Sequence, residues 1–389
     1  PVPVAADVSY GPHSHQLLDV YVPTKGDGPF PVLIWYGGIW EPSKYVPDLN
    51  HFLPEQIAVI GVQTRTLTDG MNEQAPAPVS YVMNDACRAV QFVRSNAAKW
   101  NLDSQRIAAA GSSQGALPAL YVGCAADHAD PTSDDPVARA SSRVTCVAAH
   151  RCQPSIDPQR IQQWVPGVKW GAPSLGCSFE ESLKRRNELL PLIEKWSPDA
   201  LLHQGAAPIY FENNWGLTQP DNVTEDDYKV HSPAAALGFQ KLAQQAGVVC
   251  YVKFPGHPTD GYRDIWDFIV QKLQSDVVAA HPGPLASAVQ PFMDDHTIAG
   301  AVMLVATPDR ILDVEVLGYA DPFTRRPMTE NIVFCQASIT KTFTAVAVMM
   351  LQDQGKLNVD DPVAKYLPEF KDQTVGVDQP DQTDAQPTT

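Results

Sequence analysis

The sequence predicts an α/β fold with a mainly parallel sheet and helices on both of its faces. Continuous apolar runs such as Pro31–Tyr36 and Ile57–Gln63 are typical of strands that are buried on both sides in a parallel sheet. They alternate with helical patterns such as Val79–Trp100 over about the first 275 residues, and this alternation indicates repeated βαβ units.

Length and charge set the broad class. The chain has 389 residues, which is enough for two domains. Its formal net charge of −16 argues against nucleic acid and anionic membranes as partners, because both require a basic surface. A hydrophobic content of 44% is that of a soluble globular protein, and no apolar run reaches the length of a membrane span.

Shifts in pattern give the expected domain boundaries. Residues 1–277 carry the α/β alternation, and within them the segment 151–206 lies between two predicted strands, where a cap would be inserted. Residues 278–284 are the expected linker and residues 285–371 a second region. Residues 372–389 are rich in Gln, Asp, Pro and Thr, and we expect this tail to be disordered.

A serine motif stands at the centre of the first region. Ile107–Ala110 is a short apolar strand, followed by Gly111-Ser112-Ser113-Gln114-Gly115 and a helical run. Strand, G-x-S-x-G and helix in this order form the context in which the motif carries chemistry. The two glycines permit a tight turn that exposes the hydroxyl of Ser113. Ser113 is therefore the predicted nucleophile.

A serine nucleophile needs a neighbouring base, which this fold is expected to place in the loop after its last strand. His257, in the sequence FPGHPTDGY, stands there and is the predicted base. The alternative is that His257 is an ordinary surface histidine. His150 and His231 are rivals, but both come earlier in the chain than the fold expects.

Of the nucleophile, the base and the acid that orients the base, the acid is the least defined by the sequence. It should follow the predicted strand Pro208–Phe211, yet no Asp stands a few residues past that strand. We expect Asp221 to take this role, with Glu212 and Asp157 as alternatives. Asp157 also stands where it would cap a following helix. A displaced acid, or a Ser–His pair working without one, is the remaining alternative.

Backbone donors for an oxyanion hole are expected directly after the strand Pro31–Tyr36. The sequence there is Gly37-Gly38-Ile39-Trp40, and the N–H groups of Gly38, Ile39 and Gln114 are the predicted donors. Trp40 would then line the acyl or alcohol pocket. The alternatives are an ordinary Gly-Gly turn and a tryptophan that packs the core.

The seven cysteines show no C-x-x-C pair and no zinc spacing, so we expect no metal or redox cofactor. Cys152 and Cys177 are a candidate disulfide pair that the sequence leaves open. The chain begins Pro-Val-Pro without a Met, which is consistent with signal removal or with trimming. We expect a secreted or periplasmic bacterial protein.

The motifs together resemble a known family. The stretches DVSYG, LLDVYVP, PVLIWYGGIW, RIAAAGSSQGA and FPGH, spread over residues 1–276, resemble the α/β-hydrolase superfamily, within it secreted bacterial esterases and lipases of the acetylxylan- and feruloyl-esterase kind. The resemblance implies ester hydrolysis through an acyl-enzyme on Ser113, with His257 as base. The sequence departs from the family at Tyr36, where a His is usual, and lacks the Asp of the G-x-x-D loop.

Residues 285–371 carry a second resemblance. The stretches FCQASITKTF and GKLNVDDPVAKYLPEF resemble the opening of class C β-lactamase-like serine hydrolases and penicillin-binding proteins. The resemblance implies that Ser338 is a nucleophile and Lys341 its base. The family's later Tyr-x-Asn and Lys-Thr-Gly elements do not follow, so we expect a partial α+β region without activity. Its apolar helix, Phe343–Leu351, is expected to pack on the first domain or to drive self-association.

The sequence therefore predicts a serine carboxylic-ester hydrolase that acts on acylated plant polysaccharide or other short-chain esters. The substrate class rests on family analogy alone. One alternative is a catalytically weak hydrolase fold that serves for binding. Another is a peptidase or β-lactamase-type activity.

Overall fold

The computed structural model describes residues 1–170, 172–259, 261–274, 284–295, 297–308, 311–321, 326–328, 332–373, 375–377 and 386–388. The chain divides into two compact units. One comprises Pro1–His281 with Leu304–Val314, and the other comprises Pro282–Met303 with Glu315–Thr389. The expected linker, residues 278–284, lies outside the described residues apart from Pro284.

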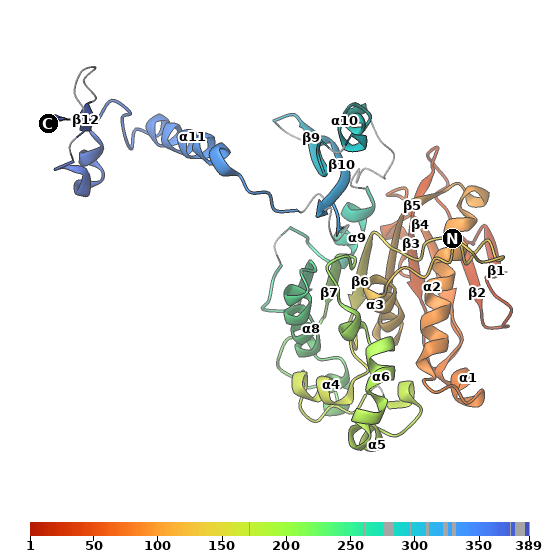
Figure 1. The fold of residues 1–389 in the computed structure, drawn as a ribbon. Coiled ribbons are helices and arrows are strands. Elements are labelled where there is room, and N and C mark those ends of the chain that lie inside the picture. Colours follow the sequence, from red (N-terminus) through yellow and green to blue (C-terminus); the bar gives the residue numbers. More distant parts are fainter. Residues whose placement is uncertain are drawn as a thin grey trace. The chain divides into compact units, whose positions relative to one another are not determined.

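An eight-stranded sheet is the frame of the first unit (Figure 1). Its β1–β2 and β2–β4 pairs are antiparallel, and every pair from β4 to β8 is parallel. The predicted mainly parallel sheet is confirmed. The spatial order is β1 (Ala5–Ser9), β2 (Leu17–Tyr21), β4 (Ala58–Gln63), β3 (Phe30–Tyr36), β5 (Leu102–Ser112), β6 (Cys146–His150), β7 (Ile209–Glu212) and β8 (Cys250–Lys253).

Helices connect the parallel strands, as the sequence pattern predicts. The helices that follow the parallel strands β4, β5, β7 and β8 lie where the alternation of strand and helix patterns in the sequence predicts them. They are α1 (Leu67–Asn72) and α2 (Val79–Ser95) after β4, α3 (Ala116–Cys124) after β5, α7 (Glu225–Val230) and α8 (Pro233–Gln245) after β7, and α9 (Ile265–Gln274) after β8.

Strand β3 shows why both faces of the sheet carry helices. All seven of its residues are buried. Ile34 and Tyr36 belong to one apolar cluster, which includes residues of α2, α3 and α8, whereas Leu33 and Trp35 belong to another, which includes residues of α9. Because side chains alternate across a strand, a strand that is apolar throughout requires cover on both sides.

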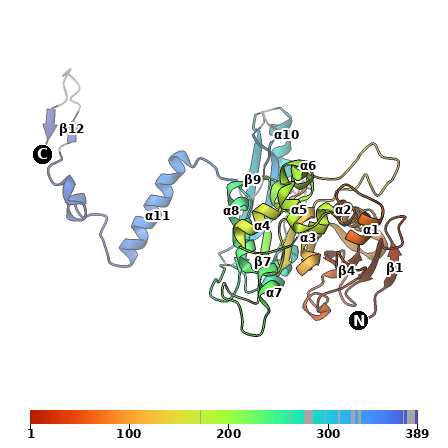
Figure 2. The same ribbon diagram turned by 90° about the horizontal axis from the view of Figure 1, so that it is seen from below.

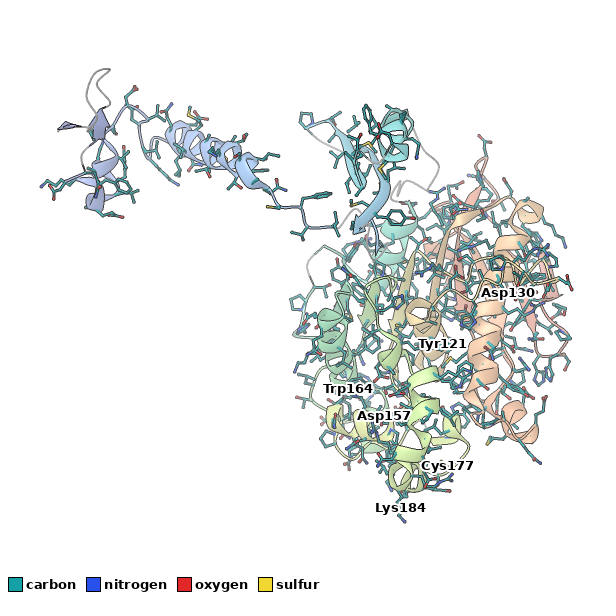
Figure 3. All side chains as sticks on the ribbon, in the orientation of Figure 1. Tyr121, Asp130, Asp157, Trp164, Cys177 and Lys184 are labelled. Carbon is teal, nitrogen blue, oxygen red and sulfur yellow. The ribbon has the colours of Figure 1, made fainter. Side chains whose placement is uncertain are left out.

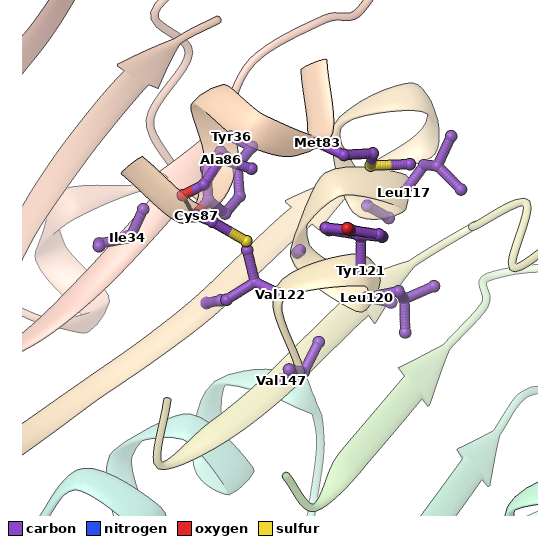
Figure 4. Close-up of a cluster of buried hydrophobic side chains, with 14 of the residues drawn as sticks. Ile34, Tyr36, Met83, Ala86, Cys87, Leu117, Leu120, Tyr121, Val122 and Val147 are labelled. Atoms are coloured by element: carbon purple, nitrogen blue, oxygen red, sulfur yellow. Dashed lines mark hydrogen bonds between the residues drawn. The ribbon is translucent and has the colours of Figure 1, made fainter. Parts of the chain in front are cut away.

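The larger cluster fixes α2 and α3 against the sheet (Figure 4). Met83 and Ala86 on α2 pack in the same group as Leu117 and Tyr121 on α3. The hydroxyl of buried Tyr36 donates a hydrogen bond of 2.9 Å to the carbonyl oxygen of Ala86. A buried hydroxyl without such a partner costs about 1–3 kcal/mol, so this bond holds α2 in register with β3.

The segment between β6 and β7 carries α4 (Pro158–Trp164), α5 (Phe179–Lys184) and α6 (Arg186–Trp196). Figure 3 labels Asp157, Trp164 and Cys177 on it. α4 packs beside α8 (Figure 2), and the ring of Trp196 on α6 stacks on Tyr121 of α3 with centroids 5.8 Å apart. The segment therefore packs beside the helices of one face. Its role as a cap stays a prediction.

The cysteines are all thiols. Cys152 is buried and Cys177 is partly exposed, and neither takes part in a disulfide. The candidate Cys152–Cys177 pair is thus not formed. Burial raises the pKa of the Cys152 thiol well above its ordinary value, which makes it an unreactive apolar side chain rather than a nucleophile.

The rest of the chain forms α10 (Pro284–Asp294), a sheet in the order β11 (Arg326–Pro327), β10 (Ile311–Asp321) and β9 (Gly300–Ala306), and α11 (Thr340–Asp353). The division into two units falls within β9 and within β10, and α11 belongs to the second unit. Phe343 and Val346 on α11 are 66% and 54% exposed, so the helix presents apolar side chains to solvent. In the tail, where the sequence predicts disorder, β12 (Val375–Val377) pairs antiparallel with β13 (Gln386–Thr388).

No helix in the described part of the chain is long and apolar enough to cross a membrane.

The turn between β5 and α3 is tightly packed, which gives a stability prediction. A Cβ at Gly115 would lie 2.4 Å from the carbonyl oxygen of Tyr36 and 2.7 Å from that of Gly37. We expect Gly115→Ala to lower the free energy of unfolding by roughly 2 kcal/mol or more, since backbone atoms must shift to admit the methyl group. Urea unfolding followed by tryptophan fluorescence measures this, because all eight tryptophans lie between Trp35 and Trp266.

Gly205→Ala is the matched control. A Cβ there meets the ring of His203 at 3.4 Å, an ordinary contact. Its unfolding midpoint should stay close to that of the parent protein, within roughly 0.5 kcal/mol. Equal destabilisation by the two substitutions would show that the close approach at Gly115 is not what constrains the turn.

Candidate active site

Ser113 occupies a sharp turn at the carboxyl end of the sheet. β5 ends at Ser112, and α3 begins three residues after Ser113. Ser113 has a φ of +52°, in the left-handed region that residues with a Cβ avoid. Such strain persists only where the surroundings impose it, and it is the backbone signature expected of a nucleophile turn.

The histidine that the structure places at Ser113 is His231. Its Nε2 lies 2.8 Å from Ser113 Oγ. Its Nδ1 lies 2.8 Å from Oδ1 of Asp227 and 3.1 Å from the carbonyl oxygen of Asp227. Both of those oxygens can only accept, so Nδ1 carries the proton and Nε2 offers its lone pair to the hydroxyl of Ser113.

Local helix geometry brings Asp227 and His231 together. They stand four residues apart, at α7 and its C-terminal cap, and residues at this spacing share one face of a helix. The side chain of Thr224 caps the helix by accepting from the N–H of Asp227. At the other end, the amide of Asn213 donates to the carbonyl oxygen of His231 at 2.6 Å. The Asp–His pair is thus one small element anchored at both ends.

Aromatic and cationic groups surround the imidazole. The ring of Trp215 meets His231 edge to face at 6.0 Å, and the guanidinium of Arg151 lies 3.7 Å above the Trp215 ring. Arg151 also approaches Asp227 to 3.9 Å. Burial and the charge of Arg151 lower the pKa of His231 from its ordinary value, and Asp227 opposes them. At neutral pH the imidazole is accordingly uncharged, the form that can accept a proton.

The prediction that His257 partners Ser113 differs from the structure. The chain makes a tight turn after β8, in which the N–H and C=O groups of Phe254 and His257 bond to each other. The ring of His257 stacks on Phe254, and its Nδ1 donates back to the carbonyl oxygen of Val252 at 3.0 Å. The turn therefore holds His257 at the end of its own strand. The missed signal was the Asp-x-x-x-His spacing of Asp227 and His231 on a short helix.

The three predicted acids also lie elsewhere. Asp221 stands in an exposed turn. Glu212 accepts from the N–H of Ile265 at 2.6 Å and pairs with Lys253 at 3.3 Å. The carboxylate on His231 is instead that of Asp227.

Asp157 has a structural role. It caps α4 by accepting from two N–H groups, and its two oxygens bind the guanidinium of Arg186 at 2.8 and 2.6 Å. The capping alternative foreseen from the sequence is confirmed. The carboxylate is therefore engaged by α4 and Arg186, and the group that lies on His231 is the carboxylate of Asp227.

The second rival histidine, His150, pairs with the neighbouring serine. Ser112 Oγ lies 3.0 Å from His150 Nδ1, and His150 Nε2 lies 3.0 Å from Oδ1 of Asn214. Ser112 and His150 are register partners on β5 and β6, so their side chains point to the same face. This chain of bonds holds the strand ends beside the turn.

The loop after β3 holds the predicted oxyanion donors. The N–H of Gly38 donates to Ser43 Oγ at 2.9 Å. The N–H groups of Ile39 and Trp40 both donate to the side-chain oxygen of Gln114, at 2.9 and 3.1 Å. The structure therefore places this loop next to the serine turn, as predicted, with its donors engaged by side chains. Trp40 itself is 38% exposed.

A cluster of three side chains has the spacing that a metal ion would require. His13, His15 and Asp69 offer ligand atoms within 4.8 Å of one another. His15 Nδ1 is already bonded to Asp69 at 2.8 Å, and His13 Nδ1 accepts from the N–H of His15. Asp69 also completes the capping box of α1. Hydrogen bonds among the three groups thus account for their arrangement.

In the second unit, Ser338 and Lys341 stand where the sequence places them, at the start of α11. Lys341 Nζ donates to Ser338 Oγ at 3.2 Å, and both residues are exposed. The spacing of three residues on a helical turn explains the contact.

Comparison with known families matches both regions. Residues 18–150 match the BD-FAE family model, and residues 285–384 match the beta-lactamase family model. The first match includes the serine turn, and the second includes Ser338 and Lys341. The resemblances inferred from the sequence are confirmed.

Individual relatives match shorter stretches. Esterase EstB of Burkholderia gladioli is 42% identical over 77 residues, which are 20% of this chain and 20% of that protein. Penicillin-binding protein 4* of Bacillus subtilis is 34% identical over 84 residues, or 22% and 18% of the two chains. The chain spans about a fifth of the length of the curated relatives it matches.

Solved structures match the fold over about two thirds of the chain. A truncated carbohydrate esterase from gut microbiota has a TM-score of 0.51 at 17% identity, over 69% of this chain and 95% of that one. A bifunctional GH43-CE protein of Bacteroides eggerthii has a TM-score of 0.50 at 20% identity, over 69% and 38%. With the parallel sheet and the serine turn, these likenesses identify the fold as that of the α/β hydrolases. The chain therefore has an α/β-hydrolase fold in which residues 18–150 are similar to the BD-FAE family, and residues 285–384 are similar to the beta-lactamase family.

Proposed function

We propose that the protein is a serine carboxylic-ester hydrolase whose nucleophile, base and acid are Ser113, His231 and Asp227. The observation that carries the proposal is the unbroken hydrogen-bond chain from Ser113 Oγ through the imidazole to the Asp227 carboxylate, with each link 2.8 Å long. Nucleophile, base and orienting acid are the set that acyl transfer requires. The strained backbone of Ser113 supports the same assignment.

The chemistry follows from the tautomer. As Ser113 Oγ attacks the ester carbon, Nε2 of His231 accepts its proton, and the carboxylate of Asp227 stabilises the resulting imidazolium through Nδ1–H. The imidazolium then gives its proton to the leaving alcohol, and an acyl-serine remains. A water molecule then attacks the acyl carbon while His231 accepts its proton. The proton returns to Ser113 Oγ as the bond to the acyl group breaks, and the carboxylic acid is released.

The negative charge that forms on the carbonyl oxygen needs backbone donors. We assign this role to the N–H of Gln114, at the start of the α3 turn, with those of Ile39 and Gly38 on the facing loop. Trp40, half exposed on that loop, would line the pocket.

For the substrate we propose acylated polysaccharide or other short-chain esters. The support is that the structural neighbour from gut microbiota is a carbohydrate esterase. The strong negative charge of the chain disfavours acidic esters, because like charges repel.

The assignment of the base gives a direct test. We expect His231→Ala to lower kcat/KM for p-nitrophenyl acetate by at least ~10³-fold, because the proton of Ser113 then has no acceptor. His257→Ala should change kcat/KM less than ~3-fold, since its imidazole serves a turn rather than the serine. Steady-state kinetics on the purified full chain, with acetate, butyrate and octanoate esters, measures both and sizes the acyl pocket.

Two serine variants complete the assay. Ser113→Ala should abolish turnover and Ser338→Ala should leave it intact. The reverse result would move the activity to the beta-lactamase-family region, and a parent protein without activity would favour a binding role. A loss in His257→Ala that equals the loss in His231→Ala would contradict the proposed base.

The environment of His231 predicts the pH profile. Ester hydrolysis needs the neutral imidazole, so kcat/KM rises with pH as the imidazolium loses its proton. Burial and Arg151 lower the pKa of His231, so the midpoint of this rise should lie below the ordinary histidine value of about 6.5.

Arg151→Met tests the cause. It removes a cation that disfavours the imidazolium, so the midpoint of the acid limb should move to higher pH while the alkaline plateau persists. The measurement is kcat/KM from pH 4 to 9, with Arg143→Met, a half-exposed arginine near Asp127, as the control. An acid limb that stays in place or moves downward would rule out the Arg151 charge as a cause.

A further inference from the structure

The oxyanion loop and the serine turn are joined by one side chain, that of Gln114. Its Oε1 accepts from two successive backbone N–H groups, those of Ile39 and Trp40, at 2.9 and 3.1 Å. The N–H of Ile39 is one of the donors assigned above to the oxyanion, and its convergence with the N–H of Trp40 on one oxygen is the arrangement that stabilises an oxyanion. The oxygen that fills it here belongs to the protein, on the residue that directly follows the nucleophile.

The loop has no spare donor in the structure. The N–H of Gly37 bonds to the carbonyl oxygen of Val62 at 3.0 Å, and the N–H of Gly38 bonds to Ser43 Oγ. With those of Ile39 and Trp40 taken by Gln114, all four N–H groups from Gly37 to Trp40 are engaged. A substrate carbonyl oxygen that enters this loop must therefore displace a resident oxygen.

Of the oxygens that these N–H groups bind, the side-chain oxygen of Gln114 is the one that a substrate oxygen can most readily replace. Ser43 satisfies one N–H within its own loop, whereas Gln114 reaches across from the turn that carries the nucleophile. The contact is close, since a Cβ at Gly38 would lie 3.0 Å from Gln114 Oε1. An amide side chain has freely rotating bonds, so it can leave without a movement of the backbone.

We propose that the Gln114 side chain is a resident ligand of the oxyanion site, which the ester carbonyl must expel before or during acylation. The inference rests on the proposed serine-hydrolase function. A neutral ester oxygen accepts these N–H groups no better than an amide oxygen does, so the exchange disfavours substrate binding. The tetrahedral oxyanion is charged, and charge-assisted bonds are about twice as strong, so it wins the exchange. Gln114 thereby makes the loop bind the transition state in preference to the substrate in its ground state.

The alternative is that the Gln114 side chain holds the loop in the conformation that catalysis requires. The two readings predict opposite signs. If Gln114 is a resident ligand, its removal speeds the attack on Ser113 even though the fold loses two hydrogen bonds. If Gln114 only stabilises the loop, its removal both slows the attack on Ser113 and destabilises the fold.

The test uses diethyl p-nitrophenyl phosphate on the full chain, with the release of p-nitrophenol giving the rate and intact mass with peptide mapping locating the adduct. We expect Gln114→Ala and Gln114→Met to be phosphorylated at Ser113 roughly threefold to tenfold faster than the parent, the range set by the net strength of the lost bonds. Gln114→Glu, whose carboxylate holds the N–H pair more firmly, should react more slowly. The KM for p-nitrophenyl acetate should fall in the Ala and Met variants.

Gln105→Ala, which changes an exposed glutamine at the other end of the same strand, is the matched control and should react like the parent. Gln114→Met keeps the length of the side chain, so it decides the question if the Ala variant does not fold. An unchanged or slower rate in the Met variant overturns the inference while leaving the serine-hydrolase function in place. Absence of any adduct on Ser113 in the parent protein overturns both.

Discussion

The structure depends on one backbone constraint, the left-handed conformation of Ser113. That φ of +52° is held by what surrounds it, since β5 is paired on both sides and the chain must enter α3 within three residues. Gly115 brings the start of the helix against the carbonyl groups of Tyr36 and Gly37, so the turn and the oxyanion loop touch through backbone atoms. The strain at one residue thus results from the packing of the central strands, and it aims one hydroxyl out of the sheet.

The groups that face this hydroxyl come from elements with different rigidity. The oxyanion loop continues directly from a buried strand, and Gln114 belongs to the turn itself. The acid, in contrast, stands on α7 and the base at its C-terminal cap, and none of the six residues of this helix is buried. Polar contacts hold it at Thr224 on one end and Asn213 on the other. Its apolar contacts are few: Val230 packs against a small apolar cluster, and the ring of Tyr228 lies beside Trp215. The chemistry we propose therefore joins a rigid nucleophile to a base on a polar, solvent-facing element.

The sequence was a good guide where chain-local patterns decide the structure. The buried strands, the turn at Ser113, the loop Gly37–Trp40 and the capping role of Asp157 all follow from short motifs whose physics is local. The base and acid were not predictable in the same way, because their positions depend on how the connection after β7 folds back over the sheet. The expectation of a histidine after the last strand favoured His257. The spacing of Asp227 and His231 on a helix was visible in the sequence, but many Asp-x-x-x-His pairs are surface ion pairs, and only the fold places this one at Ser113.

The absence of buried residues on α7 has a consequence for how activity would be lost. Stability is not uniform across a protein, and elements held by few apolar contacts open at a lower cost than the core. α7 could detach while the two apolar clusters that cover the faces of the sheet stay packed, and the serine would then lose its base and acid in one event. On heating, the loss of activity would accordingly precede the unfolding of the core, which tryptophan fluorescence reports. This first transition would be reversible on cooling. The same independence would let this connection vary in length among relatives without disturbing the strands that hold the nucleophile.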